Sequence, residues 1–257
     1  MRIDGKGLID RDHPVRFTFD GETVDGFSGD TVASALLGAG TRLMGRSFKY
    51  HRPRGVVTAG SDEPNALMTI GRGAHQRPNT RATVQEIYDG LEVRSQNRWP
   101  SLRHDAMQVT DLLSPFFAAG FYYKTFMWPR AFWEKLYEPV IRRAAGLGAL
   151  SGEDAPDISE RAYANCDVLV IGAGPAGLMA ALTAARAGAD VILADENNRA
   201  GGRLLSETTE VAGMPGVQWV GSVLAKLIEL PNVRIMERTT ITGAYDGGTF
   251  GAIERVA

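Results

Sequence analysis

The clearest pattern of apolar and polar positions lies between Cys166 and Gly202. A β-branched apolar run at residues 168–171 is bounded by glycine, which predicts a strand buried on both faces. A second apolar run at residues 191–194 predicts another buried strand. Between them, Gly188 ends a predicted helix whose apolar positions have helical spacing: Leu178, Ala181, Leu182 and Ala185.

The turn between the first strand and the helix reads Gly172-Ala173-Gly174-Pro175-Ala176-Gly177, a G-x-G-x-x-G motif. Gly172 permits a tight turn, Gly174 leaves room for a pyrophosphate, and Gly177 lets the helix pack close to the sheet. Pro175 suits the first helical turn, where its missing N–H costs nothing. With Ala176 and Gly177, it begins a helix whose free N–H groups attract phosphate.

Two acids, Asp195 and Glu196, end the second strand, about 20 residues beyond the motif. A carboxylate at this point accepts hydrogen bonds from the adenosine ribose and repels a 2′-phosphate. The sequence therefore predicts binding of NAD or FAD rather than NADP, and the motif does not separate NAD from FAD. The alternative is a tight strand–helix turn that binds no ligand.

The first hundred residues follow a different pattern. Residues 15–19 alternate, Asp20-Gly21 turns, and residues 22–24 return, which predicts a β-hairpin. Asp30 is positioned to cap a short helix at residues 31–37. Hairpin, helix, long loop and strand is the order of a β-grasp domain, which we place at residues 1–95.

We interpret Cys166 as a small buried residue at the start of the strand predicted at residues 168–171.

Composition narrows the class of protein. The chain has 257 residues, a net charge of −2 and one cysteine, Cys166, which excludes a disulfide framework and a multi-cysteine metal site. No signal peptide and no apolar run of spanning length is evident, so we expect a cytoplasmic protein without nucleic-acid or membrane partners. The four histidines lack paired metal spacing, and we interpret them as ordinary surface or loop residues: His13, His51, His75 and His104.

The long loop at residues 46–68 resembles that of the ferredoxin-like domain at the front of amine-oxidising flavoenzymes. Members with a [2Fe–2S] cluster carry C-x4-C-x2-C there, and the corresponding positions are Thr58, Glu63 and Ala66. We therefore predict a ferredoxin-like domain without an Fe–S cluster and with no metal site. Five Lys or Arg and no acid lie in residues 42–54. This stretch is either a solvated loop or a surface for docking or phosphate contact.

Residues 96–160 form a predicted helical connector rich in aromatic side chains, with a helix at residues 131–145 and a polar linker at residues 151–159. We expect the aromatic residues to pack against a partner subunit or another domain rather than a membrane surface. The segments QNRWPSL, SPFFAAGFYYKTFMWP and FWEKLYEPVIRRAAGLG resemble the α subunits of heterotetrameric sarcosine oxidases. That resemblance runs through nearly the whole chain.

The resemblance implies an oxidoreductase that demethylates sarcosine to glycine, with H2O2 and formaldehyde or 5,10-methylenetetrahydrofolate as the other products. It implies β, γ and δ subunits in a heterotetramer, NAD in the dinucleotide domain, and FAD and FMN in the full assembly. It also adds Arg203, near the adenosine or pyrophosphate, and Ile241, near the adenine, to the cofactor-binding residues.

Residues 161–257 predict only the N-terminal part of a Rossmann-type FAD/NAD(P)-binding domain, with a helix at 219–230 and strands at 233–240 and 250–256. The fold class is thus α/β plus α+β, and we expect the remaining C-terminal part of an α subunit as a further partner. The sequence shows no catalytic residue, so this segment alone is predicted to be inactive. Three alternatives stay open: a subunit of a related FAD-dependent amine or opine oxidoreductase, a complete FAD-dependent enzyme, and a non-enzymatic interaction module.

Overall fold

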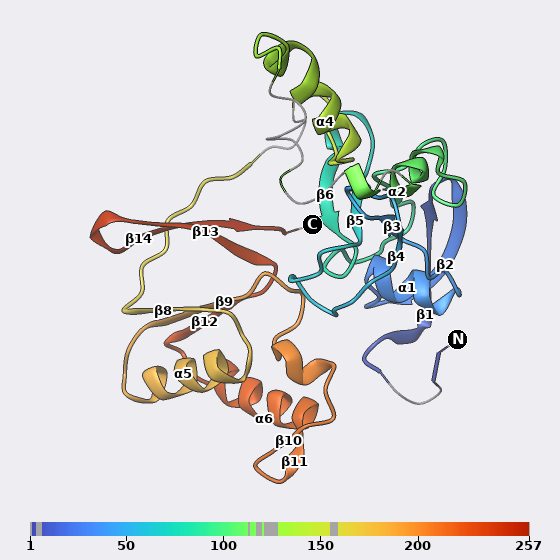
Figure 1. The fold of residues 1–257 in the computed structure, drawn as a ribbon. Helices are drawn as coiled ribbons and strands as arrows, with labels where there is room; N and C mark the ends of the chain where they lie inside the picture. The colour runs from blue at the N-terminus through green and yellow to red at the C-terminus, as the bar shows by residue number, and fades with distance from the viewer. Residues whose placement is uncertain are drawn as a thin grey trace. The chain divides into compact units, whose positions relative to one another are not determined.

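The fold is taken from a computed structural model that describes residues 2–3, 7–112, 114–116, 120, 128–154 and 159–256. The chain divides into two compact units, Met1–Ile158 and Ser159–Ala257 (Figure 1). Each unit has its own hydrophobic core. The two units are therefore described separately.

The first unit is built on a five-stranded mixed sheet in the order β2-β1-β7-β5-β6. The hairpin of β1 (Asp10–Phe19) and β2 (Glu22–Ser28) turns at Asp20 and Gly21, both with positive φ, as the sequence predicts. β1 also pairs in parallel with β7 (Glu92–Ser95). β5 (Leu67–Ile70) is antiparallel to both β7 and β6 (Arg77–Arg81).

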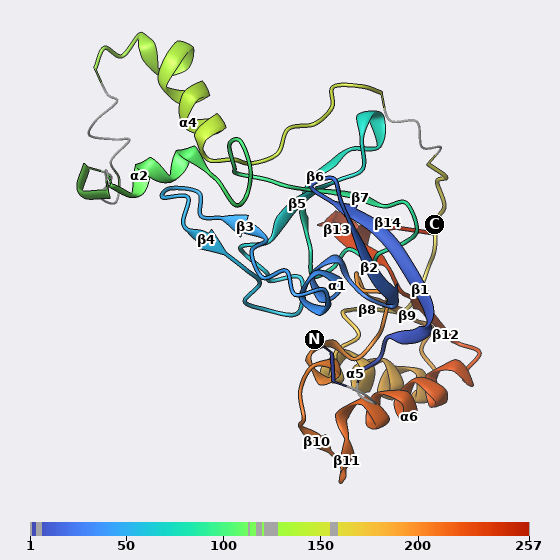
Figure 2. The same ribbon diagram turned by 90° about the vertical axis from the view of Figure 1, so that its right-hand side faces the viewer.

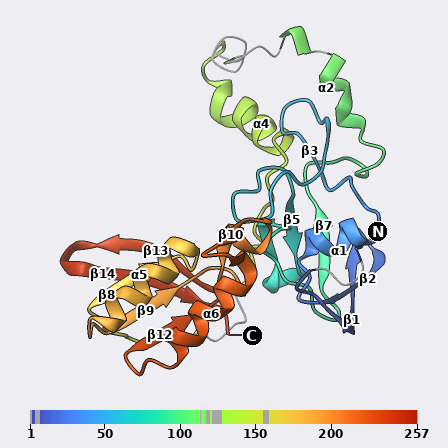
Figure 3. The same ribbon diagram turned by 90° about the horizontal axis from the view of Figure 1, so that it is seen from below.

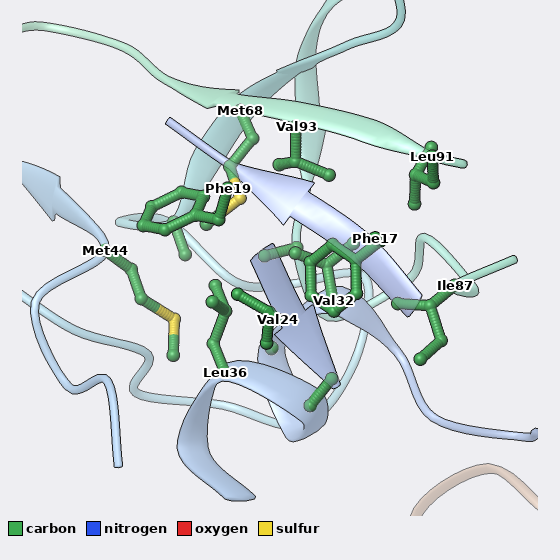
Figure 4. Packing of buried hydrophobic residues seen from close by; sticks show 14 of the residues in the cluster. Phe17, Phe19, Val24, Val32, Leu36, Met44, Met68, Ile87, Leu91 and Val93 are labelled. Atoms are coloured by element: carbon green, nitrogen blue, oxygen red, sulfur yellow. The ribbon is translucent and has the colours of Figure 1, made fainter. Parts of the chain in front are cut away.

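The helix α1 (Val32–Gly38) supplies one side of the first core. Thr31 rather than Asp30 is its N-cap, in a capping box with Ser34, so the predicted cap is wrong by one residue. The carboxylate of Asp30 is buried and instead accepts hydrogen bonds from the guanidinium of Arg2 and the N–H of Phe27. Figure 4 shows Leu36 of α1 in the same cluster as three side chains of the sheet: Phe17, Met68 and Val93.

Most of the long loop between α1 and β5 has no regular structure, apart from the two-residue strands β3 (Gly45–Arg46) and β4 (Pro53–Arg54). The connector that follows β7 contains short helical segments: η2 (Ala106–Gln108), α2 (Val109–Leu112), η3 (Ser114–Phe116), the π-helical turn η4 (Trp133–Tyr137) and α4 (Glu138–Ala144). η1 (Gly73–His75) lies between β5 and β6. Most of the predicted aromatic run, residues 117–119 and 121–127, lies outside the described residues, as do residues 155–158 of the predicted linker.

The second unit is built on a parallel sheet in the order β12-β9-β8, with β8 at Val168–Ile171, β9 at Val191–Ala194 and β12 at Val233–Met236. The strands are in register, and Ile171 and Met236 both lie beside Ala194. The prediction that β8 is buried on both faces is wrong, since Ile171 is 58% exposed. In this sheet only β9 has a neighbouring strand on each side, and β9 is fully buried.

Two helices, α5 (Pro175–Arg186) and α6 (Gly216–Ile228), lie on the same side of this sheet (Figure 1, Figure 2). The four apolar positions predicted for α5 are all buried in the second core. α6 begins three residues before the predicted start. Its buried face joins that core through Trp219, Val220, Val223 and Leu227.

The strand predicted at residues 233–240 is divided into β12 and the start of β13 (Thr239–Tyr245), which forms a hairpin with β14 (Thr249–Glu254). This hairpin extends beyond β8 and β9 (Figure 1, Figure 3). The remaining elements are η5 (Gly202–Leu205), η6 (Asp246–Gly248) and the strands β10 (Glu210–Val211) and β11 (Met214–Pro215). Cys166 precedes β8 and is half-buried, so the prediction that it is buried is wrong.

Candidate dinucleotide-binding site

The turn from β8 into α5 has the conformation that the glycine motif predicts. Gly172 adopts a φ of +96°, which favours glycine because other side chains are strained there. A Cβ on Gly177 would lie 1.9 Å from the carbonyl oxygen of Gly172, so no side chain fits at that position. Both glycines are therefore required by the turn itself, with or without a ligand.

Gly174 has neither constraint, because its φ is −69° and a Cβ built there would meet no atom within 4 Å. Its backbone borders open space, which is the condition for a ligand to approach it closely. Gly202 flanks this position, since a Cβ on Gly202 would lie 3.0 Å from the Cα of Gly174. The N–H of Gly201 donates to the carbonyl oxygen of Ala173 at 2.8 Å. Sequence reasoning missed the role of the Gly201-Gly202 pair, although the doubled glycine is visible in the sequence.

The first turn of α5 is oriented for anion binding. Gly174 is its N-cap and has no side chain to cap the helix, and Pro175 occupies the first turn. The first intrahelical bond shown runs from the N–H of Leu178 to the carbonyl oxygen of Gly174, at 2.9 Å. The N–H groups of Ala176 and Gly177 precede it, and such groups at a helix start carry partial positive charge. A pyrophosphate beside Gly174 would meet this end of the helix.

The two acids after β9 have different environments. Asp195 is buried, and its carboxylate accepts hydrogen bonds from the N–H of Ala173 at 2.6 Å and from the N–H and side-chain amide of Asn197 at 2.8 and 2.9 Å. These bonds tie the end of β9 to the glycine turn. Glu196 is half-buried, and no hydrogen bond to its carboxylate is found in the described part of the chain. Glu196 is thus the acid of this pair whose carboxylate remains available to a ribose.

The other two predicted contacts lie outside this network. Arg203 follows Gly202 in η5, but its side chain is 90% exposed and forms an ion pair with Glu207 at 2.8 Å. Ile241 is half-buried in β13, where it pairs with Ala252 of β14. The structure therefore ties Asp195 to the turn of Gly172 and Gly174 through Ala173, and within the described residues no hydrogen bond or ion pair links the side chains of Arg203 or Ile241 to them.

The loop that corresponds to the cluster loop of ferredoxin-like domains holds a carboxylate. Glu63 is 1% exposed, and its oxygens accept hydrogen bonds from the N–H groups of Val57, Thr58 and Asn65 at 2.7, 2.8 and 2.8 Å. None of Thr58, Glu63 and Ala66 offers a thiolate, so these residues do not fit a [2Fe–2S] cluster held by cysteines. Among the described residues, no group of three or more His, Cys, Asp or Glu side chains is arranged to hold a metal ion.

His51 corrects the prediction of ordinary surface or loop histidines. It is 3% exposed, and its Nδ1 lies 2.6 Å from Oδ2 of Asp105, which is also buried. The other Asp105 oxygen accepts hydrogen bonds from the N–H groups of Trp99 and Met107. The His51–Asp105 pair therefore fixes the long loop to the connector. Sequence reasoning had no signal for it, because 54 residues separate the partners.

Arg46 is an exception within the basic stretch, in which Arg42, Arg52 and Arg54 are exposed. It is 6% exposed and donates to the carbonyl oxygens of Leu102, at 2.6 and 3.0 Å, and of His51, at 3.0 Å. This guanidinium is neither solvated nor available for docking, because its donors are used inside the unit. The remaining cations include Arg52, whose exposed side chain forms an ion pair with Asp111.

Two family models match separate parts of the chain. One, described as a 2Fe–2S iron–sulfur cluster binding domain, matches residues 12–98. The other, described as an FAD-dependent oxidoreductase, matches residues 167–242, the part that contains the glycine turn. The class that these matches define is a chain of two units, the first similar to 2Fe–2S cluster binding domains and the second similar to FAD-dependent oxidoreductases.

Comparison with individual proteins narrows this class. The chain is 60% identical over 99% of its length to the sarcosine oxidase subunit alpha of Rhizobium meliloti (strain 1021), and 34% identical over 96% of its length to that of Corynebacterium sp. (strain U-96). The chain is thus a relative of sarcosine oxidase α subunits, and the predicted resemblance is confirmed. It spans about a quarter of the length of these curated relatives, 26% and 21%.

Among solved structures, the crystal structure of L-proline dehydrogenase from P. horikoshii matches 98% of this chain and 38% of its own. The TM-score is 0.55 and the sequence identity is 18%, so this match supports the fold alone. Within the residues that the structure describes, no helix has the length and apolar character to cross a membrane.

Proposed function

We propose that the second unit binds NAD at the turn formed by residues 172–177, as part of a flavoenzyme subunit. The open space beside Gly174 is the observation that carries this proposal, because the positive φ explains Gly172 and close packing explains Gly177, whereas neither explains Gly174. The helix start at Pro175 adds free N–H groups beside the same space. An acid at the end of β9 adds a partner for the ribose.

Within this proposal the residues have separate roles. The backbone at Gly172, Gly174, Ala176 and Gly177 receives the pyrophosphate. Glu196 accepts hydrogen bonds from the ribose hydroxyls, and its negative charge disfavours the 2′-phosphate of NADP. Asp195 is a positioning residue, because it holds the N–H of Ala173. We keep Arg203 near the adenosine or pyrophosphate and Ile241 near the adenine, on the resemblance alone. A bound dinucleotide supplies the redox group, and this chain supplies its binding and orientation.

For the whole protein we propose the oxidative demethylation of sarcosine to glycine, with oxygen as acceptor and H2O2 and formaldehyde or 5,10-methylenetetrahydrofolate as products. The names of the two α-subunit relatives support this. The assembly would be a cytoplasmic heterotetramer with β, γ and δ subunits that carries FAD and FMN besides NAD. The residues described here would serve cofactor binding and assembly rather than catalysis.

We also propose that the first unit carries no Fe–S cluster, although its family model is described as cluster-binding. Thr58, Glu63 and Ala66 occupy the positions of three cluster cysteines and none of them has a thiol, which supports this proposal.

A second candidate for the site is FAD, which the FAD-dependent-oxidoreductase model over residues 167–242 favours. Calorimetric titration of the purified protein with NAD, FAD and NADP distinguishes the two. Saturable NAD binding without NADP binding supports the proposal. Binding of FAD alone, or tightly held flavin in the preparation that excludes NAD, assigns the site to FAD. A folded protein that binds none of the three contradicts both.

A further inference from the structure

We propose that the loop of residues 57–66 contains an anion-binding nest of backbone N–H groups, and that the chain's own Glu63 carboxylate fills it as an internal anion. The site takes a small carboxylate when that side chain is removed. The proposal rests on the first unit and is independent of the dinucleotide site in the second.

The geometry shows a carboxylate enclosed by donors. Oε2 of Glu63 accepts from the N–H groups of Val57 and Thr58 at 2.7 and 2.8 Å, and Oε1 accepts from the N–H of Asn65 at 2.8 Å. The hydroxyl of Thr58 adds a longer contact to Oε2 at 3.4 Å. Three N–H groups from two sides of the loop therefore converge on one carboxylate.

Because Glu63 is buried, its ionised carboxylate depends on these hydrogen bonds for stabilisation. Glu63 is 1% exposed, and an ionised carboxylate in such a position is costly unless donors replace the lost water. Burial raises the pKa of the Glu63 carboxyl, but hydrogen bonds from the N–H groups of Thr58, Val57, Asn65 and Ala66 together hold the pKa below its ordinary value. Arg81 donates to the Glu63 carbonyl oxygen at 3.2 Å rather than to the carboxylate. Backbone dipoles thus supply the stabilisation.

Glu63 lies at a position that a cluster-ligating cysteine occupies in related ferredoxin-like domains. Thr58, Glu63 and Ala66 have the spacing of cluster-ligating cysteines in ferredoxin-like domains, and the family model for this unit is described as cluster-binding. In this chain Thr58 contributes a donor, and Glu63 contributes the anion that accepts from it. A carboxylate therefore organises the loop where a negatively charged cluster would need the same kind of donors.

The test uses hydrogen exchange, read by mass spectrometry, at the amides of residues 57–66 in the full-length protein. Glu63→Ala should exchange about tenfold faster or more at Val57, Thr58 and Asn65, because each loses its acceptor. The matched control is Asp62→Ala, which removes the neighbouring exposed carboxylate and should leave this exchange unchanged. If Glu63→Ala does not fold, Glu63→Gln serves instead, since it keeps the side-chain shape and replaces one acceptor oxygen with a donor.

Chemical rescue tests the anion site directly. Sodium formate should slow exchange in Glu63→Ala back toward the wild-type rate, whereas sodium chloride at the same ionic strength should not. If Asp62→Ala accelerates exchange as much as Glu63→Ala does, the loop depends on charge in general and the proposal fails. Equal effects of formate and chloride would also overturn it, as would wild-type exchange in both Glu63 variants.

Discussion

The Asp195 carboxylate accepts a hydrogen bond from the N–H of Ala173 at 2.6 Å, and this bond joins the end of β9 to the middle of the glycine turn. The two residues are 22 positions apart in the sequence. Because Asp195 is buried and both of its oxygens are used, its first task is to hold the turn. Glu196, the next residue, has no such bond in the described residues and is free to meet a ligand.

This division of roles predicts different effects for two conservative substitutions. Asp195→Asn places an amide N–H₂ against a backbone N–H, so we expect a loss of about 1–3 kcal/mol in unfolding free energy together with weaker NAD binding. Glu196→Gln should change the unfolding free energy by less than about 0.5 kcal/mol and weaken NAD binding roughly tenfold. Denaturant unfolding and calorimetric titration measure the two quantities. Equal loss of stability in both variants would contradict the division.

Gly174→Val should abolish dinucleotide binding while the protein remains folded. The side chain would enter the space beside Gly174, which holds no protein atom within 4 Å but is needed by a pyrophosphate. Gly221→Ala is the control, because Gly221 lies in α6, is exposed and also has open space around it. We expect it to bind NAD normally and to gain up to about 1 kcal/mol of stability. Unchanged affinity in Gly174→Val would mean that the motif is only a turn.

Two His–Asp pairs with nearly equal N···O distances should contribute differently to the free energy of unfolding. His51 and Asp105 are 2.6 Å apart with side chains 4% and 0% exposed, whereas His13 and Asp10 are 2.7 Å apart with side chains 74% and 51% exposed. His51→Ala should lower the free energy of unfolding by about 2–4 kcal/mol, since it leaves a buried carboxylate without one partner. His13→Ala should cost less than about 1 kcal/mol. Chemical denaturation of the two variants checks this, and similar losses would show that burial does not decide the outcome.

The proposal that the first unit holds no cluster predicts that purified protein contains no stoichiometric iron in this unit. Iron analysis and visible absorbance of the purified 257-residue chain measure this. Reddish-brown protein with iron in a fixed ratio would overturn the interpretation of Thr58, Glu63 and Ala66.

Acid should destabilise the first unit through Glu63. The pKa of its carboxyl is lower in the folded protein than its ordinary value, so its contribution is fully present above the unfolded pKa, about 4.3. That contribution is lost as the pH falls through the folded pKa. Glu63→Gln should therefore lower stability at neutral pH and flatten its dependence on pH in the acidic range. Thermal unfolding between neutral and acidic pH measures this, and parallel profiles for variant and wild type would contradict it.

The sequence predicted the parts of this protein that depend on local pattern. Helical spacing identified the buried face of α5, and the Asp20-Gly21 turn placed the first hairpin. The glycine motif located the β8–α5 turn, because Gly172 and Gly177 are required by the backbone geometry of the turn itself. Propensity was less precise at element ends: α6 begins earlier than predicted, and Thr31 rather than Asp30 caps α1.

Tertiary structure decided what depends on partners distant in the sequence. The sequence alone identified Asp195 and Glu196 as an acid pair, but only the approach of Ala173 distinguished their roles. The sequence alone placed Arg46 in a basic loop, yet Arg46 is buried and donates to Leu102. It placed His51 among ordinary surface or loop histidines, yet His51 is buried against Asp105. Burial and hydrogen bonding depend on which groups meet in space, and periodicity along the chain carries no information about contacts 50 or more residues apart.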